Sequence, residues 1–217
     1  MSLRINDTIP DLTVETDLGA ISLHDFVGDQ WAIFFSHPKD FTPVCTTEFG
    51  AVAQLADEWE RRGTKVLGIS VDGVEEHKKW KVDIEKVGGA KPGFAIVADR
   101  DLAMSKAFDM LPAEAYLPDG ATPADSATVR AVFIVGPDKK LKLSMTYPMN
   151  VGRNFAEVLR ALDGLQTAAS QGVATPANWN VGDDVVIPTA VSDADAEAKF
   201  GAFKTVLPYL RMTNLYK

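Results

Sequence analysis

Short apolar runs alternate with segments of helical periodicity along most of this chain, and that alternation restricts the fold more than any other feature. The runs 31–36, 65–71 and 94–98 are rich in branched and aromatic residues, as strands buried on both faces are. Helical periodicity follows them from Thr46 to a stop at Gly63, over 74–87 and over 102–110. The order predicts a mixed α/β sheet with helices on both faces.

The remaining segments extend this sheet. Two short extended pieces flank a turn at 17–19, and strand-like runs at 128–135 and 141–147 enclose the hairpin signal 136–140. An amphipathic helix is expected over 155–168. Prolines at three positions make 111–125 a loop, and loops of that length often serve function.

The composition changes after about residue 172, so we expect a main domain over 1–168 and a C-terminal extension over 169–217. The extension contains a helix-like stretch over 192–203 that begins with a serine N-cap. So short a segment cannot build a core alone. We expect it to pack on the main domain or on a second copy of the chain.

Charge and cysteine content restrict the partners and the compartment. The chain of 217 residues carries 22 Lys and Arg against 30 Asp and Glu, a net charge of −8, which disfavours nucleic acid and anionic lipid. No apolar run reaches transmembrane length, and the first residues lack the pattern of a signal peptide. Because one cysteine cannot form an intramolecular disulfide, we expect a cytoplasmic protein.

That cysteine, Cys45, lies where a strand gives way to a helix, in the segment SHPKDFTPVCTTEFG. Thr42 suits the N-cap and Pro43 the first helical position, so Cys45 falls in the first turn. The free N–H groups and the helix dipole favour a thiolate there. Since a dipole alone contributes only about 0.3–1 kcal/mol, a reactive thiolate also needs a nearby cation or strong donors.

The segment DFTPVCTTE resembles the active-site loop of the peroxiredoxins, in which P-x-x-x-[TS]-x-x-C surrounds the peroxidatic cysteine. Here the pattern is met by Pro38, Thr42 and Cys45. The stretch 130–166 and the tail NWNVGDDVVIPTAVSDADAEAKF are similar to the one-cysteine subfamily. The resemblance implies a thioredoxin-like fold whose C-terminal extension helps build a homodimer.

By this resemblance Cys45 is the nucleophile, Thr42 hydrogen-bonds the peroxide, and Arg130 holds the thiolate and polarises the O–O bond. A peroxide must be aligned for in-line attack while the departing oxygen gains donors, and a rigid guanidinium suits that task. Supporting positions are Pro38, which shields the site, Val44, His37, Glu48 and Arg153. Glu48 is expected to pair with an arginine, and the histidine matching His37 is associated in the subfamily with the oxidised cysteine.

Plainer interpretations exist for the same residues. A lone cysteine is often a small buried apolar residue. Strand alternation alone makes Arg130 a solvated residue, so its role depends on the resemblance. His37 fits a loop or core histidine bonded to backbone equally well. The histidines and Cys45 show no metal-ligand spacing, and no phosphate-binding loop occurs, so neither a metal nor an organic cofactor is expected.

The sequence therefore predicts a thiol-dependent peroxidase that reduces hydrogen peroxide and organic hydroperoxides through a sulfenic acid on Cys45. Without a second cysteine, the sulfenic acid must be reduced by an external thiol, either a small thiol, a glutathione-linked partner or a thioredoxin-type protein. The alternative is a redox sensor or holdase chaperone that Cys45 oxidation switches. A peroxidase turns over many times with an external thiol, whereas a sensor reacts about once.

Overall fold

The computed structural model describes residues 3–115 and 126–216, and the chain divides into two compact units, Met1–Arg153 and Asn154–Lys217. The predicted domain boundary at residue 168 stays a prediction, although the structure groups the helix before it with the C-terminal unit. Of the predicted loop 111–125, the part 116–125 lies outside the described residues. Its first part holds a single 3-10 turn at Ala113–Ala115.

The described strands of the first unit form one seven-stranded mixed sheet in the order β2-β1-β5-β4-β3-β6-β7. The strands are β1 (Thr13–Thr16), β2 (Gly19–Ser22), β3 (Trp31–Ser36), β4 (Thr64–Ser70), β5 (Ala95–Ala98), β6 (Arg130–Val135) and β7 (Leu141–Tyr147). Strands β3, β4 and β5 are parallel neighbours, whereas β1–β2 and β6–β7 are antiparallel hairpins. The predicted mixed sheet with an antiparallel edge is confirmed.

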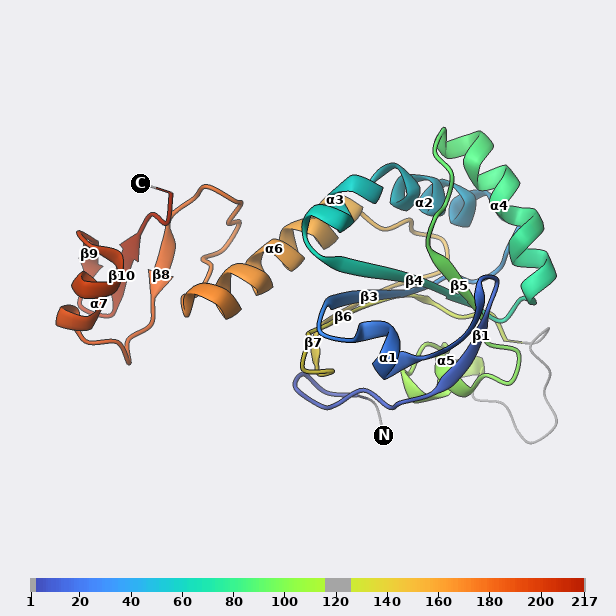
Figure 1. Ribbon diagram of the computed structural model, residues 1–217, viewed down its shortest axis with the longest axis horizontal. Coiled ribbons are helices and arrows are strands. Elements are labelled where there is room, and N and C mark those ends of the chain that lie inside the picture. The colour runs from blue at the N-terminus through green and yellow to red at the C-terminus, as the bar shows by residue number, and fades with distance from the viewer. Residues whose placement is uncertain (1–2, 116–125, 217) are drawn as a thin grey trace. The chain divides into compact units, whose positions relative to one another are not determined.

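Helices cover both faces of this sheet. Figure 1 shows α2, α3 and α4 on one face and α1 and α5 on the other. Their bounds are α1 (Leu23–Val27), α2 (Pro43–Gln54), α3 (Ala56–Arg61), α4 (Val74–Gly88) and α5 (Ala103–Ala107). Within 3–115 and 126–216, no helix is both long enough and apolar enough to span a bilayer.

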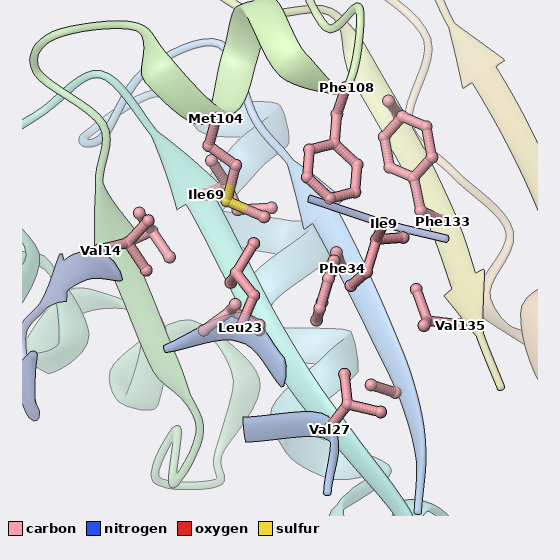
Figure 2. Close-up of a cluster of buried hydrophobic side chains, with 14 of the residues drawn as sticks. Ile9, Val14, Leu23, Val27, Phe34, Ile69, Met104, Phe108, Phe133 and Val135 are labelled. Carbon is pink, nitrogen blue, oxygen red and sulfur yellow. The ribbon is translucent and has the colours of Figure 1, made fainter. Parts of the chain in front are cut away.

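The face under α1 and α5 is an apolar core (Figure 2). Phe34 of β3 and Phe133 of β6 meet Phe108, whose ring makes edge contacts with both at 5.9 and 5.3 Å. Leu23 and Met104, from the two helices, are completely buried in the same cluster. Apolar burial of this kind fixes the sheet beneath the site.

The opposite face, under α2 and α4, is lined by aromatic rings. Phe49 of α2 lies 4.7 Å from the ring of Phe35 and 4.7 Å from that of Trp80. Gly68 of β4 makes room for it, because a Cβ there would lie 2.8 Å from the Phe49 ring. The absent side chain lets α2 approach the sheet closely, and α2 carries Cys45 with it.

The predicted single helix between Thr46 and Gly63 is wrong in one respect, since α2 ends at Gln54 and α3 begins at Ala56. At Leu55 the N–H bonds back three residues to the carbonyl of Val52. This tighter turn redirects the chain so that Trp59 becomes buried and its indole N–H donates to the same carbonyl at 3.1 Å. The apolar period continues through the break, so it does not indicate the break.

The C-terminal unit begins with α6 (Phe155–Gln171), which the Asn154 side chain caps by accepting the N–H groups of Ala156 and Glu157. A three-stranded sheet follows in the order β8-β10-β9, with α7 between its strands in sequence. The elements are β8 (Val185–Ile187), α7 (Asp193–Phe200), β9 (Lys204–Leu207) and β10 (Leu210–Thr213). The predicted serine cap is confirmed, because the Ser192 hydroxyl accepts the N–H of Asp195.

Candidate active site

Cys45 lies in the first turn of α2, as the sequence predicts. The first helical hydrogen bond runs from the Thr46 N–H to the Thr42 carbonyl at 3.0 Å, so the amides of Val44 and Cys45 precede it. Thr42 has the extended backbone of an N-cap, but its side chain does not cap the helix. Its hydroxyl instead donates to the Lys39 carbonyl at 2.8 Å, because the loop turns back there.

Arg130 starts β6 on the same face of the sheet as α2. In the β3–β6 register, Val132 lies opposite Phe35 and Ile134 opposite Ile33, and alternation puts Arg130 on that side. The intervening Ala131 faces the core under α1 and α5. The interpretation of Arg130 as a solvated residue is therefore wrong, because helices cover both faces and leave it only 3% exposed.

The guanidinium of Arg130 joins the sulfur to a carboxylate. Its Nη1 lies 3.3 Å from Cys45 Sγ and donates to Glu48 Oε2 at 2.6 Å, while Nε donates to the Met149 carbonyl at 2.8 Å. Cys45 is completely buried among the described residues of this chain. The Met149 carbonyl and the Glu48 carboxylate hold this guanidinium in place. A fixed cation beside a thiol stabilises the thiolate form.

Glu48 lies one turn after Cys45 on the buried face of α2 and binds a second arginine. Arg153 donates from Nε and from its backbone N–H to Oε1 at 2.9 and 2.8 Å, and from Nη2 to Oε2 at 2.8 Å. The expected pairing of Glu48 with an arginine is observed with two of them. Burial opposes ionisation, but hydrogen bonds and charge from Arg153, followed by the charge of Arg130, hold the pKa of Glu48 below its usual value.

Arg153 also fixes the sheet against the site. Its Nη1 donates to the carbonyls of Ser36 and Ala131, both at 2.8 Å, and its guanidinium lies 5.2 Å from the centre of the Phe35 ring. The carbonyls belong to the ends of neighbouring strands, β3 and β6. One side chain thereby ties both strands to the carboxylate of α2.

Two arginines and one carboxylate meet beside the sulfur. Arg130 and Arg153 are both buried and contribute two positive charges, whereas Glu48 contributes one negative charge. Buried charges are costly unless they are compensated. The guanidinium of Arg130, 3.3 Å from Cys45 Sγ, is the electrostatic reason to expect a nucleophilic thiolate here.

The other predicted residues lie around this cluster with different contacts. Pro38 is buried in the loop before α2, and Val44 is half-buried. Gly152 lies close to Val44, since a Cβ on it would be 3.5 Å from Val44 Cγ1. His37 is completely buried, and its Nε2 lies 2.7 Å from Asp40 Oδ1.

His37, Asp40 and His77 form a second buried cluster that sequence analysis did not identify. Asp40 Oδ1 lies 2.7 Å from His37 Nε2, and Asp40 Oδ2 lies 2.7 Å from His77 Nδ1. The helical spacing of His77, Trp80 and Ile84 on one apolar face of α4 is a signal that could have located His77. The interpretation of His37 as a core histidine bonded to backbone is incomplete, because its ring bonds a carboxylate.

These residues also bear on metal binding. Potential ligand atoms of His37, Asp40 and Asp72 lie within 4.8 Å of one another. Both Asp40 oxygens already accept hydrogen bonds from histidines, and Asp72 Oδ2 accepts from the Asp40 N–H and the Ser70 hydroxyl at 2.8 and 3.0 Å. The carboxylate oxygens that accept these bonds are therefore already engaged in hydrogen bonds.

A cavity of about 540 Å³ lies on the same unit, between the β1–β2 hairpin and α3. Val52, Trp59 and Phe94 contribute to its mostly apolar lining, and none of the eight predicted site residues lines it.

The charged cluster around Cys45 therefore lies outside this cavity, and its chemistry follows from its own residues. A buried thiolate with a fixed guanidinium can attack a small electrophile and stabilise the charge that develops on the leaving atom.

Comparisons with known proteins agree with this chemistry. Residues 5–144 match the model of the AhpC/TSA family, and residues 164–202 match the C-terminal domain of 1-Cys peroxiredoxin. The chain is 51% identical to 1-Cys peroxiredoxin B of Oryza sativa subsp. indica over 98% of both proteins.

Two solved structures are similar to this chain. A yeast mitochondrial 1-Cys peroxiredoxin, studied for thiol resolution via glutathione/thioredoxin systems, has a TM-score of 0.87 and 43% identity over 98% of this chain and 99% of that one. A cysteine-to-serine mutant of peroxiredoxin 6 of Arenicola marina has a TM-score of 0.91 and 38% identity over the whole of both chains.

Proposed function

This chain belongs to the AhpC/TSA family and, within it, to the 1-Cys peroxiredoxins; it is therefore a thiol-dependent peroxidase, and we propose that Cys45 is its peroxidatic residue. The observation that carries this proposal is the contact of 3.3 Å between Arg130 Nη1 and Cys45 Sγ. The thiolate attacks one oxygen of the hydroperoxide, and the O–O bond breaks as the S–O bond forms. The sulfur is oxidised by two electrons and stays on Cys45 as the sulfenic acid, while the departing oxygen is reduced and takes a proton from solvent to become water or an alcohol.

We assign the alignment of the peroxide to Thr42 and Arg130. The Thr42 hydroxyl already donates its proton to the Lys39 carbonyl, so its oxygen is left to accept the O–H of a peroxide. Arg130 then donates to the oxygens as charge moves along the O–O bond. Because Met149 and Glu48 hold the guanidinium, it needs little reorganisation at the moment of reaction.

The supporting roles follow from position. Glu48 orients Arg130 and offsets its positive charge, and Arg153 holds Glu48 in place. Val44 and Pro38 limit access of water to the sulfur. His37 is assigned to the oxidised state, in which it accepts a hydrogen bond from the sulfenic acid.

The reductant must come from outside the chain, since Cys45 is its only cysteine. The yeast relative was studied with the glutathione and thioredoxin systems. We propose the same classes here: a small thiol, a glutathione-linked protein or a thioredoxin-type protein. Hydrogen peroxide and organic hydroperoxides are the proposed oxidants.

A steady-state assay tests the function. Peroxide consumption is followed with glutathione, its reductase and glutaredoxin, and separately with thioredoxin and its reductase. Cys45→Ser is the inactive control. Many turnovers per molecule support the peroxidase. A single oxidation of Cys45 with no turnover in either system, together with a change of assembly, supports the sensor or holdase instead.

Excess peroxide without a reductant should convert Cys45 to sulfinic acid, because an unresolved sulfenic acid stays open to a second peroxide. Intact-mass spectrometry after graded peroxide additions measures the oxygens gained. A thiol that stops at one added oxygen under large excess contradicts this expectation.

We propose that the protein is a homodimer or a higher homo-oligomer. Support comes from the C-terminal unit, where Val206, Leu207 and Tyr209 are exposed on and after β9. Exposed apolar residues that cluster are typical of interfaces. Sedimentation analysis across a range of concentrations tests the proposal, and a monomer at all of them contradicts it.

The proposed compartment is the cytoplasm, supported by a single thiol that must stay reducible. The yeast relative is mitochondrial, so the compartment has to be measured. Cell fractionation with detection of the untagged protein does so.

A further inference from the structure

The second buried cluster has a hydrogen-bonding pattern that fixes its charges. His37 and His77 have no exposed surface, and Asp40 is 3% exposed. Asp40 lies between the two rings, with one carboxylate oxygen 2.7 Å from each. Every proton in such a cluster can be placed by asking which atoms are able to donate.

His77 faces an acceptor on each side of its ring. Nε2 lies 3.1 Å from the carbonyl of Val97, which can only accept, so Nε2 carries a proton. Nδ1 lies 2.7 Å from Asp40 Oδ2. Although burial opposes it, hydrogen bonding to the two histidines lowers the pKa of Asp40 to about 2, so this oxygen also only accepts. Turning the ring over would place carbon atoms against both acceptors.

His37 differs from His77 because, within residues 3–115 and 126–216, only one of its ring nitrogens has a partner. Nε2 donates to Asp40 Oδ1, whereas Nδ1 is buried and has no hydrogen-bond partner among those residues. Burial lowers the pKa of His37, although Asp40 opposes that change, so Nδ1 keeps its lone pair. The ring is stacked on Trp80 at 4.8 Å and meets the edge of Phe49 at 4.5 Å, which fixes its direction.

We propose that His77 is a buried imidazolium which, through the carboxylate of Asp40, fixes His37 as the Nε2–H tautomer with a bare acceptor at Nδ1. His77 and Asp40 are thus positioning residues. Their positive and negative charges compensate each other. Asp72 accepts the Asp40 N–H at 2.8 Å, and its charge, like that of Asp40, raises the pKa of His37 against the larger effect of burial.

The functional consequence rests on the proposed function. His37 Nδ1, which has no hydrogen-bond partner in the part of the chain that the structure describes, can accept the S–OH proton of the sulfenic acid. Trp80 links the cluster to the site, because its indole N–H donates at 3.0 Å to the hydroxyl of Thr46, the residue after Cys45. A fixed acceptor lengthens the lifetime of the sulfenic acid and slows its oxidation by a second peroxide.

The charge states are tested directly by long-range proton–nitrogen NMR of the reduced protein at neutral pH. The chain has three histidines, and variants His24→Gln and His77→Gln assign the signals. The expected result is two protonated nitrogens on His77 and an Nε2–H neutral ring for His37. A neutral His77, or an Nδ1–H form of His37, overturns the proposal. This result is independent of whether the protein consumes peroxide.

The positioning role is tested by comparing two rates of Cys45 oxidation. The rate at which the sulfenic acid is oxidised to sulfinic acid is divided by the rate at which the thiol is oxidised to sulfenic acid. His77→Gln and Asp40→Asn should raise this ratio at least about fivefold and mix the His37 tautomers, since the fixed acceptor is lost. The matched control is His24→Gln, which removes a partly buried ring bonded to the Ile9 carbonyl at 2.8 Å. A wild-type ratio in folded variants with mixed tautomers overturns the role. A wild-type protein without turnover contradicts the proposed function and leaves the NMR result standing.

Discussion

Replacing Arg130 with glutamine removes a guanidinium that lies 3.3 Å from the sulfur. The fold should survive the change, because Glu48 keeps the hydrogen bonds and the charge of Arg153. Glutamine is shorter, but its amide nitrogen occupies the position of arginine Nε and can still donate to the Met149 carbonyl. The substitution therefore removes the positive charge beside the thiol while keeping a donor for that carbonyl.

The size of the effect follows from the contact. At 3.3 Å and an effective dielectric constant of about 20, a unit pair interacts by roughly 5 kcal/mol before desolvation is counted. The net value of a hydrogen bond to a charged group is about 1.5–3 kcal/mol. Since 1.36 kcal/mol is a factor of ten, the rate of Cys45 oxidation should fall by about 10- to 150-fold.

Arg130→Lys should give an intermediate rate. Lysine keeps the charge, but a single ammonium cannot donate to the Met149 carbonyl and also contact both Glu48 and the sulfur from a fixed plane. The order arginine, lysine, glutamine distinguishes a need for charge alone from a need for the rigid fork. Equal rates for arginine and lysine would remove the fork from the mechanism.

The assay is single-turnover oxidation of Cys45 by hydrogen peroxide, measured by rapid mixing and trapping of the sulfenic acid for mass spectrometry. The matched control is Arg61→Gln, which removes an exposed arginine paired with Glu58. Circular dichroism checks the fold of each variant. A rate for Arg130→Gln within about threefold of the wild type, under 1 kcal/mol, would refute the electrostatic reasoning.

Two further predictions concern stability. Gly88→Ala should lower the free energy of unfolding by about 1–3 kcal/mol, because a Cβ at this position would lie 2.6 Å from Gly50 Cα where α2 and α4 meet. Urea titration measures the change, and an unchanged free energy would contradict the close approach of the two helices. Asp40, with a pKa of about 2 against 3.8 when free, should contribute about 2 kcal/mol of stability above pH 3.8 that is lost as the pH falls toward 2. Asp40→Asn should therefore be less stable at neutral pH and show a shallower loss of stability in acid, and an unchanged slope would contradict the assignment.

Most of the sheet could be predicted because its strands are continuous apolar runs separated by clear helical periods. The C-terminal strands β8, β9 and β10 could not. They are three or four residues long. Every residue of β9 is exposed, so burial does not mark it, and the alternating burial of β8 and β10 extends over too few residues to distinguish them from loop. Short strands of this kind are defined by their partners, which a local pattern cannot identify.

The thiol and its helix start could be located from the residues themselves. Thr42, Pro43 and Cys45 form a local signal, and Glu48 follows one helical turn later on the same face. The buried pair of Asp40 and His77 could not be found, because 37 positions separate them and their contact depends on how α4 packs. Local patterns identify groups that share an element, whereas contacts between elements need the fold.

Arg130 shows how strand alternation should be read when both faces of a sheet are covered. Alternation assigns a polar residue to solvent only if one face is open. All six residues of β6 are buried, so its arginine has no solvent to reach and must find an anion inside the protein. An arginine that opens an apolar run such as RAVFIV is therefore itself a site prediction. Here the anions are the carboxylate of Glu48 and the sulfur of Cys45, which neighbouring turns of α2 present to it.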